Sequence, residues 1–262
     1  CSCLKGKDAL VKTLNLVDKF NYLVNENSEV ELVKGYKDIF KITSKDKIAA
    51  LLAIEGADGI LDLSILRVFY KLGVRLITLC WNHRNHIAEG TNEIRANGGV
   101  TEFGRKFIKE MNKLGMIIDV SHLTPASFWD VIEITKDPIV ASHSNVKELC
   151  NHKRNLDDKQ IKAIADKNGL IGINFSPEFI KDSSKVGIED IVEHIKYIKN
   201  LVGIDYIALG TDYDGISETP DKLSNIGDLP NLFKVLEKNN FKEDEIVKIK
   251  RDNWLRVFKE VL

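Results

Sequence analysis

The stretch that decides the fold is IIDVSH at residues 117–122, where a short apolar run ends on His122. The same pattern places Glu55, His143 and Asp212 directly after other short apolar runs. Each run is typical of a buried strand. Because the carboxyl ends of parallel strands meet on one face of an α/β barrel, groups far apart in the sequence can share one pocket. We therefore expect a metal-ligand site with a further carboxylate beside it.

Strand and helix patterns alternate after an amphipathic helix expected at residues 8–25. Strands are predicted at 49–54, 75–79, 116–120, 139–142, 170–174 and 206–210. Helices are predicted at 63–72, 101–114, 126–134, 157–167, 188–201, 229–238 and 243–261. Left-handed caps are expected between helix and strand at Gly73, Gly115, Gly169 and Gly203. The predicted fold class is α/β, a TIM-like (β/α)8 barrel that lacks its first two β/α units, since six strands do not close it.

The composition is that of one soluble enzyme domain. With 262 residues, 44% hydrophobic content and a formal net charge of −1, the chain can bury a large core. The balanced charge argues against nucleic acid or an anionic membrane as a partner. No linker or low-complexity tract divides residues 1–262, so we expect a single domain. No apolar stretch reaches the roughly 18 residues that a membrane span needs, and no signal peptide is found.

The cysteines bear on the cellular compartment. There are four, Cys1, Cys3, Cys80 and Cys150, which are too few and too scattered for a disulfide framework. A cytoplasmic location is therefore expected. We expect Cys1 and Cys3 to form an inert, frayed terminus rather than a metal clip or a lipidated end.

The residue types at the strand ends favour zinc. A lone histidine in this position is more often structural, but two histidines together with a glutamate and an aspartate favour a metal site. Glu55, His122 and His143 supply three ligands, enough for one open zinc site. The other four histidines weigh less: His152 and His194 are expected to be solvated, whereas His83 and His86 follow a strand end and stay candidates.

Several strings resemble the membrane (renal-type) dipeptidase family, particularly its bacterial members. They are AIEG at 53–56, LITLCWN at 76–82, GMIIDVSH at 115–122, ASHSN at 141–145, RNL at 154–156, IGINF at 171–175 and LGTDYDG at 209–215. The resemblance extends in order from near residue 5 to the end of the chain. It implies a metal-dependent barrel related to the amidohydrolases, with two zinc ions bridged by a glutamate.

The resemblance also implies a role for individual residues. Glu55 would be the bridging carboxylate, and His122 and His143 would hold one zinc. Asp212 would be the proton shuttle, and Arg154 would pair with the terminal carboxylate of the substrate. The implied activity is hydrolysis of the peptide bond of a dipeptide by a metal-activated water.

The sequence departs from the family in places that concern the metal. The family holds its other zinc with a His-x-Asp pair at the end of the first strand, and this sequence contains no His-x-Asp. About two β/α units, roughly 60 residues, are therefore expected to be absent, and at most one zinc is expected here. A substrate-contacting histidine of the family is replaced by Trp81, and His83 could reach the same space. Near the end, Arg251 and Asp252 replace a Gly-Gly pair.

Three functions remain open at this stage. The first is a zinc dipeptidase with a small dipeptide as substrate, without a nucleic acid or membrane partner, and with a homodimer allowed. The second is an inactive or metal-poor remnant that serves as a binding module. The third is an amidohydrolase acting on N-acyl or D-amino-acid amides, because a fold does not fix a substrate.

Overall fold

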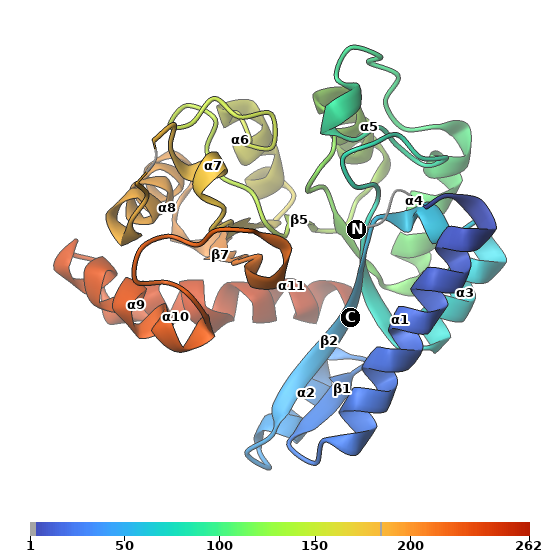
Figure 1. The fold of residues 1–262 in the computed structure, drawn as a ribbon, viewed down its shortest axis with the longest axis horizontal. Coiled ribbons are helices and arrows are strands. Elements are labelled where there is room, and N and C mark those ends of the chain that lie inside the picture. The colour runs from blue at the N-terminus through green and yellow to red at the C-terminus, as the bar shows by residue number, and fades with distance from the viewer. Residues whose placement is uncertain (1–3, 184) are drawn as a thin grey trace. The chain divides into compact units, whose positions relative to one another are not determined.

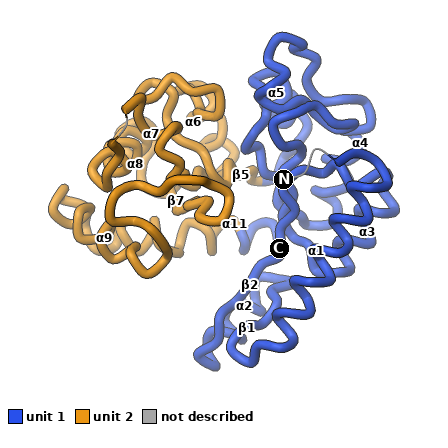
Figure 2. Tube along the Cα trace, in the orientation of Figure 1, with its two compact units in different colours: residues 1–137, 258–262 blue, residues 138–257 orange. Residues whose placement is uncertain are grey.

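The computed structural model describes residues 4–183 and 185–262, in which strands and helices alternate (Figure 1). The chain forms two compact units, residues 1–137 with 258–262 and residues 138–257 (Figure 2). The single domain expected over residues 1–262 stays a prediction. Cys1 and Cys3 lie outside the described residues, whereas Cys80 and Cys150 are buried.

The first unit contains four strands that pair in parallel in the order β1-β2-β3-β4. β1 pairs with residues 48–51 of β2, and β3 pairs with residues 52–55. The first unit therefore brings the carboxyl ends of β2, β3 and β4 to one edge. Its elements are α1 (Gly6–Glu26), β1 (Val30–Val33), α2 (Tyr36–Thr43), β2 (Ile48–Glu55), α3 (Leu63–Lys71), β3 (Val74–Thr78), α4 (Glu102–Leu114), β4 (Ile117–Asp119) and α5 (Pro125–Ile134).

The second unit contains three strands, and β6 pairs in parallel with both β5 and β7. A π-helical turn at Lys248–Asp252 links α10 to α11, which closes the chain. The elements are β5 (Ile139–Ala141), α6 (Asp158–Asp166), β6 (Leu170–Ile173), α7 (Pro177–Ile180), α8 (Ile188–Val202), β7 (Ile207–Leu209), α9 (Leu229–Lys238), α10 (Glu243–Val247) and the first part of α11 (Asn253–Val261), whose residues from 258 onward belong to the first unit.

All six predicted strands are confirmed, and the described residues contain a seventh. The additional strand is β1, whose sequence VELV was not predicted as a strand. The expectation that two β/α units are lacking is therefore corrected, because seven strands are one fewer than the eight of a (β/α)8 barrel. The α/β class and the alternation of strands and helices are as predicted.

Three of the four predicted cap glycines have a positive φ, and Gly115 adopts the expected left-handed conformation with ψ of 53°. Gly73, Gly115 and Gly203 have φ angles of 105°, 67° and 100°. Gly169 does not have a positive φ. The preceding residue, Asn168, adopts the left-handed conformation instead, with φ of 54°. Gly169 is needed for a different reason: a Cβ there would lie 2.3 Å from the carbonyl oxygen of Ile139.

Burial differs among the strands: β2, which ends on Glu55, has exposed and half-buried residues, whereas β3 to β6 are buried throughout. Every residue of β3, β4, β5 and β6 is buried, as expected for parallel strands covered on both faces. In the first unit, α4 begins at the cap Thr101, whose side chain accepts from Gly104 N, and buries Phe107, Ile108 and Met111 completely. Rigid strands of this kind hold the loops that follow them in defined positions.

His194, which we expected to be solvated, is instead buried on α8, with 1% of its surface exposed. Its Nε2 lies 2.8 Å from the carbonyl oxygen of Ile180, and its Nδ1 accepts from Val146 N at 3.1 Å. Both contacts are satisfied by the neutral ring. Burial accordingly lowers the pKa of His194.

We predict that His194 makes stability depend on pH. The unfolded ring protonates near its ordinary pKa of about 6.5, while the folded ring resists protonation. Its contribution is therefore fully present above about pH 6.5 and is lost as the pH falls through the lowered pKa. The urea midpoint should drop less between about pH 8 and pH 5.5 in His194→Gln than in the parent. Equal drops in the two proteins would refute this role.

Candidate metal centre

Glu55 and His122 lie in contact within the first unit. Glu55 is the last residue of β2, and His122 follows β4 by three positions. Glu55 Oε1 is 2.9 Å from His122 Nε2, and the side chains are 38% and 7% exposed. The structure therefore brings a carboxylate and an imidazole together at the carboxyl ends of β2 and β4, the two strands that flank β3.

The turn after β4 is built to deliver His122. The Asp119 carboxylate accepts from Thr78 Oγ1 at 2.6 Å and from Ser121 N at 2.9 Å. His122 itself has φ of 70°, in the left-handed region that non-glycine residues seldom adopt. Such conformations persist where the surroundings over-determine them, and they cluster at functional sites.

Trp81 lies beside the same imidazole. Its ring centroid is 6.0 Å from that of His122, with the planes tilted by 40°. Trp81 and Glu55 also line one end of a cavity of about 390 Å³ between α1 and the last residues of β2. The lining is largely apolar and includes Leu16, Phe20 and Leu52. Apolar space therefore adjoins the polar pair.

His83 does not share those contacts in the structure. Its Nδ1 is 3.4 Å from Glu93 Oε1, its Nε2 is 3.3 Å from Asn92 Nδ2, and the side chain is 53% exposed. These neighbours belong to the loop that follows β3. A substrate contact by His83 stays a prediction.

His143 lies in the second unit, two residues after β5. Its surface is 9% exposed, and its Nδ1 is 2.7 Å from the hydroxyl of Ser142. Arg154, which is 4% exposed, donates from Nη2 to the carbonyl oxygen of His143 at 3.2 Å, and its guanidinium lies 5.6 Å from the ring centroid of Phe179. The second unit thus brings together two of the predicted site residues.

Asp212 follows β7 and is held by an amide that the sequence analysis missed. Asn174, fully buried after β6, donates from Nδ2 to Asp212 Oδ2 at 3.0 Å. The Oδ1 of Asn174 accepts from Ser176 N at 2.6 Å, which fixes the orientation of the amide. Asp212 has φ of 59°, so both Asp212 and His122 adopt left-handed backbone conformations.

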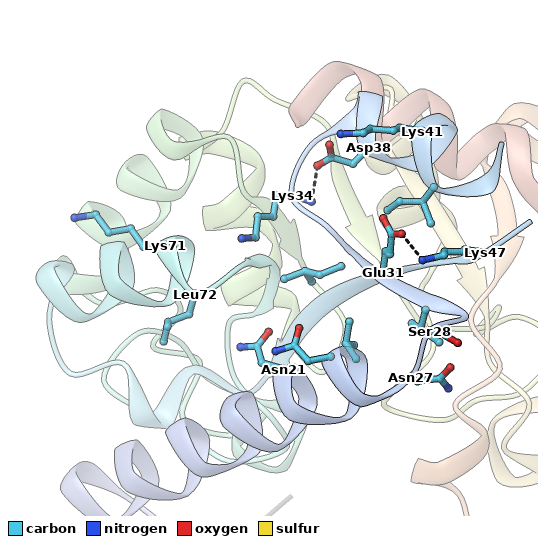
Figure 3. Close-up of a pocket in the computed structure, with 15 residues that line it drawn as sticks. Asn21, Asn27, Ser28, Glu31, Lys34, Asp38, Lys41, Lys47, Lys71 and Leu72 are labelled. Atoms are coloured by element: carbon cyan, nitrogen blue, oxygen red, sulfur yellow. Dashed lines mark hydrogen bonds and ion pairs between the residues drawn. The ribbon is translucent and has the colours of Figure 1, made fainter. Parts of the chain in front are cut away.

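A groove against β1 and the ends of α1, α2 and α3 has different chemistry (Figure 3). Its volume is about 730 Å³, and its rim includes Lys34, Lys41, Lys47 and Lys71. Glu31 accepts from Lys47 at 2.7 Å within it. The residues that line this groove include no histidine or cysteine, so we do not regard it as a metal centre.

Comparison with known proteins decides the family. The family model described as membrane dipeptidase (Peptidase family M19) matches residues 2–262. The chain belongs to this family. In the described part of the chain, no helix is both long enough and apolar enough to cross a membrane.

Two relatives show how far the likeness to M19 proteins extends. A Klebsiella pneumoniae protein described only as uncharacterized, in the pqqA 5′ region, is 39% identical over 228 residues, which are 83% of this chain and 84% of that protein. An uncharacterized dipeptidase of Schizosaccharomyces pombe is 33% identical over 257 residues, 95% of this chain. The chain covers 62% of the yeast protein's length.

A solved structure supports the fold of this M19 chain. The crystal structure of an amidohydrolase from Pseudomonas aeruginosa matches with a TM-score of 0.88 and 29% identity. The match covers 96% of this chain and 85% of the other. The TM-score at this coverage supports the α/β, TIM-like fold class.

The donors in the first unit fit a divalent metal. Glu55 Oε1 and His122 Nε2 face each other at 2.9 Å, and an imidazole nitrogen with a carboxylate oxygen is a donor pair that zinc accepts. His122 is nearly buried, which limits competition from water for its ring. The family is one of metallopeptidases, and the residues present agree with that chemistry.

Proposed function

We propose that the chain carries the centre of a zinc-dependent dipeptidase. The observation that supports this most is the contact between Glu55 and His122 at the ends of β2 and β4, in a chain that belongs to family M19. His143, which follows β5, is proposed as the third ligand. A dipeptide is the proposed substrate, and the yeast relative named as a dipeptidase supports this class.

The proposed ligands divide the chemistry between the metal and the protein. A bound zinc ion would supply the Lewis acidity that activates water and polarises the scissile carbonyl. Glu55, His122 and His143 would hold it, and at most one zinc is proposed for this chain. Three protein ligands leave a position open, as catalytic zinc sites require.

Asp212 is proposed to move the proton. A carboxylate within reach can accept the proton of the attacking water and return it to the leaving amine. The hydrogen bond from Asn174 holds Oδ2, so the carboxylate has a fixed orientation. A fixed orientation reduces the reorganisation that proton transfer would otherwise need.

Arg154 is proposed to recognise the free carboxylate of the dipeptide. Its guanidinium offers a planar fork of donors that matches a carboxylate. It is 4% exposed, so a carboxylate that it binds would be largely desolvated. Removing one partner of a desolvated pair is costly, because the other charge is left buried and unpaired.

We predict that Arg154→Ala lowers kcat/KM for dipeptides by about two orders of magnitude or more, because leaving a buried carboxylate unpaired costs about 2–5 kcal/mol. Dipeptides with an amidated carboxyl end should be affected much less. Steady-state kinetics on matched free and amidated substrates measures the difference. Equal losses on both would show that Arg154 does not bind the carboxylate.

One alternative activity has an observation in its favour. The Pseudomonas aeruginosa structure that matches this chain is named an amidohydrolase, so hydrolysis of N-acyl or D-amino-acid amides is the second candidate.

The zinc-supplemented chain should be assayed on dipeptides, including those with D-configured carboxyl-terminal residues, and on N-acyl amino acids. We expect chelator-sensitive cleavage of dipeptides. Cleavage of N-acyl amino acids alone would support the alternative, and cleavage of neither would support a binding module.

The proposal also covers the type of partner, the cellular compartment and the oligomeric state. The balanced charge supports a partner that is a small molecule rather than a nucleic acid. The scattered cysteines favour the cytoplasm, and a homodimer is compatible with the proposal. Fractionation of cells and light scattering of the purified chain would test these two statements.

A further inference from the structure

The side chain of Asn82 lies against the imidazole of His122 on the side away from Glu55. Asn82 belongs to the loop that follows β3, and its Oδ1 is 2.8 Å from His122 Nδ1. The other ring nitrogen, Nε2, is 2.9 Å from Glu55 Oε1. The two nitrogens of one ring therefore face two different partners, an amide oxygen and a carboxylate.

Which nitrogen of an imidazole carries the proton is set by the hydrogen bond of the other. A hydrogen bond from Nδ1–H to a fixed acceptor leaves Nε2 to act as a ligand, and it also holds the orientation of the ring. Asn82 Oδ1 can serve as this acceptor. Glu55 lies on the other side, where a cation between the carboxylate and Nε2 would satisfy both groups.

The loop holds Asn82 rigidly against His122. Asn92 N donates to the Asn82 carbonyl at 2.8 Å, and Thr91 N donates to the His122 carbonyl at 2.9 Å. Neighbouring residues of one short segment therefore anchor both partners. The segment can approach this closely because residue 90 is a glycine. A Cβ at Gly90 would lie only 2.0 Å from the carbonyl oxygen of Trp81.

The direction of the amide has support from a second contact. The Thr91 hydroxyl donates to Asn82 Oδ1 at 3.3 Å, so the oxygen of the amide lies between Thr91 and the ring. We propose that Asn82 is a positioning residue, whose Oδ1 accepts the Nδ1 proton of His122 and thereby presents Nε2 toward Glu55 and the metal. The metal part of this inference rests on the proposed function, whereas the position of the Nδ1 proton does not.

Two substitutions show whether the Asn82 amide acts on His122 as a hydrogen-bond acceptor or as a donor. Asn82→Leu removes the acceptor at similar volume, and Asn82→Asp retains an oxygen that can only accept. We expect Asn82→Leu to raise the Kd for zinc about 10- to 100-fold, the usual effect of losing the hydrogen-bond partner of a ligating histidine. Asn82→Asp keeps the acceptor, so its Kd for zinc should be no more than about threefold above that of the parent protein. Asn92→Ala, in the same loop, is the matched control and should not change the Kd.

Calorimetric titration with zinc gives these constants, and circular dichroism shows whether each variant is folded. An unchanged Kd in Asn82→Leu, or an equal loss of zinc affinity in Asn82→Asp, would overturn the proposal.

Nitrogen NMR of the metal-free chain gives a second, independent result: Nδ1 of His122 should carry a proton in the parent. An unprotonated Nδ1 would overturn the proposal even if zinc binds. A protonated Nδ1 in a parent that binds no zinc would sustain the hydrogen bond and refute the metal centre.

Discussion

Replacing Asp212 by Asn should lower kcat for dipeptide hydrolysis by about two to four orders of magnitude, the usual contribution of a general acid–base group. The amide keeps the size of the side chain but cannot accept the proton. Asn174 holds Asp212 Oδ2 at 3.0 Å and can still bond to an amide oxygen, so the substitution should leave the fold intact. Metal analysis should show an unchanged zinc content, because Asp212 is not a proposed ligand.

Asp214 offers a matched control for this experiment. It lies two residues further along in the same turn, and its side chain is exposed. Asp214→Asn removes the same charge and should leave kcat within about threefold of the parent, since surface substitutions of this kind have small effects. A kcat for Asp212→Asn within tenfold of the parent would refute the proposed role of Asp212.

Replacing His122 by Ala should abolish zinc retention after exhaustive dialysis. The substitution removes the ligand whose Nε2 faces Glu55 and leaves at most two of the three proposed ligands. His86→Ala is the control, because the His86 ring bonds to the Ile60 carbonyl at 2.9 Å and is not a proposed ligand. We expect one zinc per chain in the control and none in His122→Ala.

Two outcomes of the zinc-retention experiment would contradict the proposed ligands. Unchanged zinc content in His122→Ala would refute its assignment as a ligand. Two retained zinc ions in the parent would show that ligands beyond Glu55, His122 and His143 are present. Alanine at position 122 would keep the positive φ of 70°, so thermal unfolding must show that His122→Ala is folded before its zinc content is compared.

Much of the fold could be predicted because four of the strands, β3 to β6, are buried along their whole length. Runs such as residues 117–119 and 139–141 are continuously apolar or end on a functional group, so composition alone identifies them. β1 escaped prediction because it has four residues, of which only Val33 is buried, and Glu31 within it pairs with Lys47. A strand this short lacks a pattern that distinguishes it from a loop.

The two amides near the site could not be predicted for a different reason. Asn82 lies 40 residues before His122, and Asn174 lies 38 residues before Asp212. Neither amide has a periodic pattern or a spacing that links it to its partner. Asn174 directly follows β6 and Asn82 lies four residues after β3, so a search for polar residues after every buried strand would have included both.

X-ray absorption at the zinc edge tests the central claim most directly, because it reports the ligands of the metal. For the chain loaded with one zinc, the account predicts two imidazole nitrogens at about 2.0–2.1 Å, a carboxylate oxygen and no sulfur. The spectrum of His143→Ala should contain one imidazole fewer. A sulfur shell, or an imidazole count that neither His122→Ala nor His143→Ala changes, would contradict a centre built from Glu55, His122 and His143.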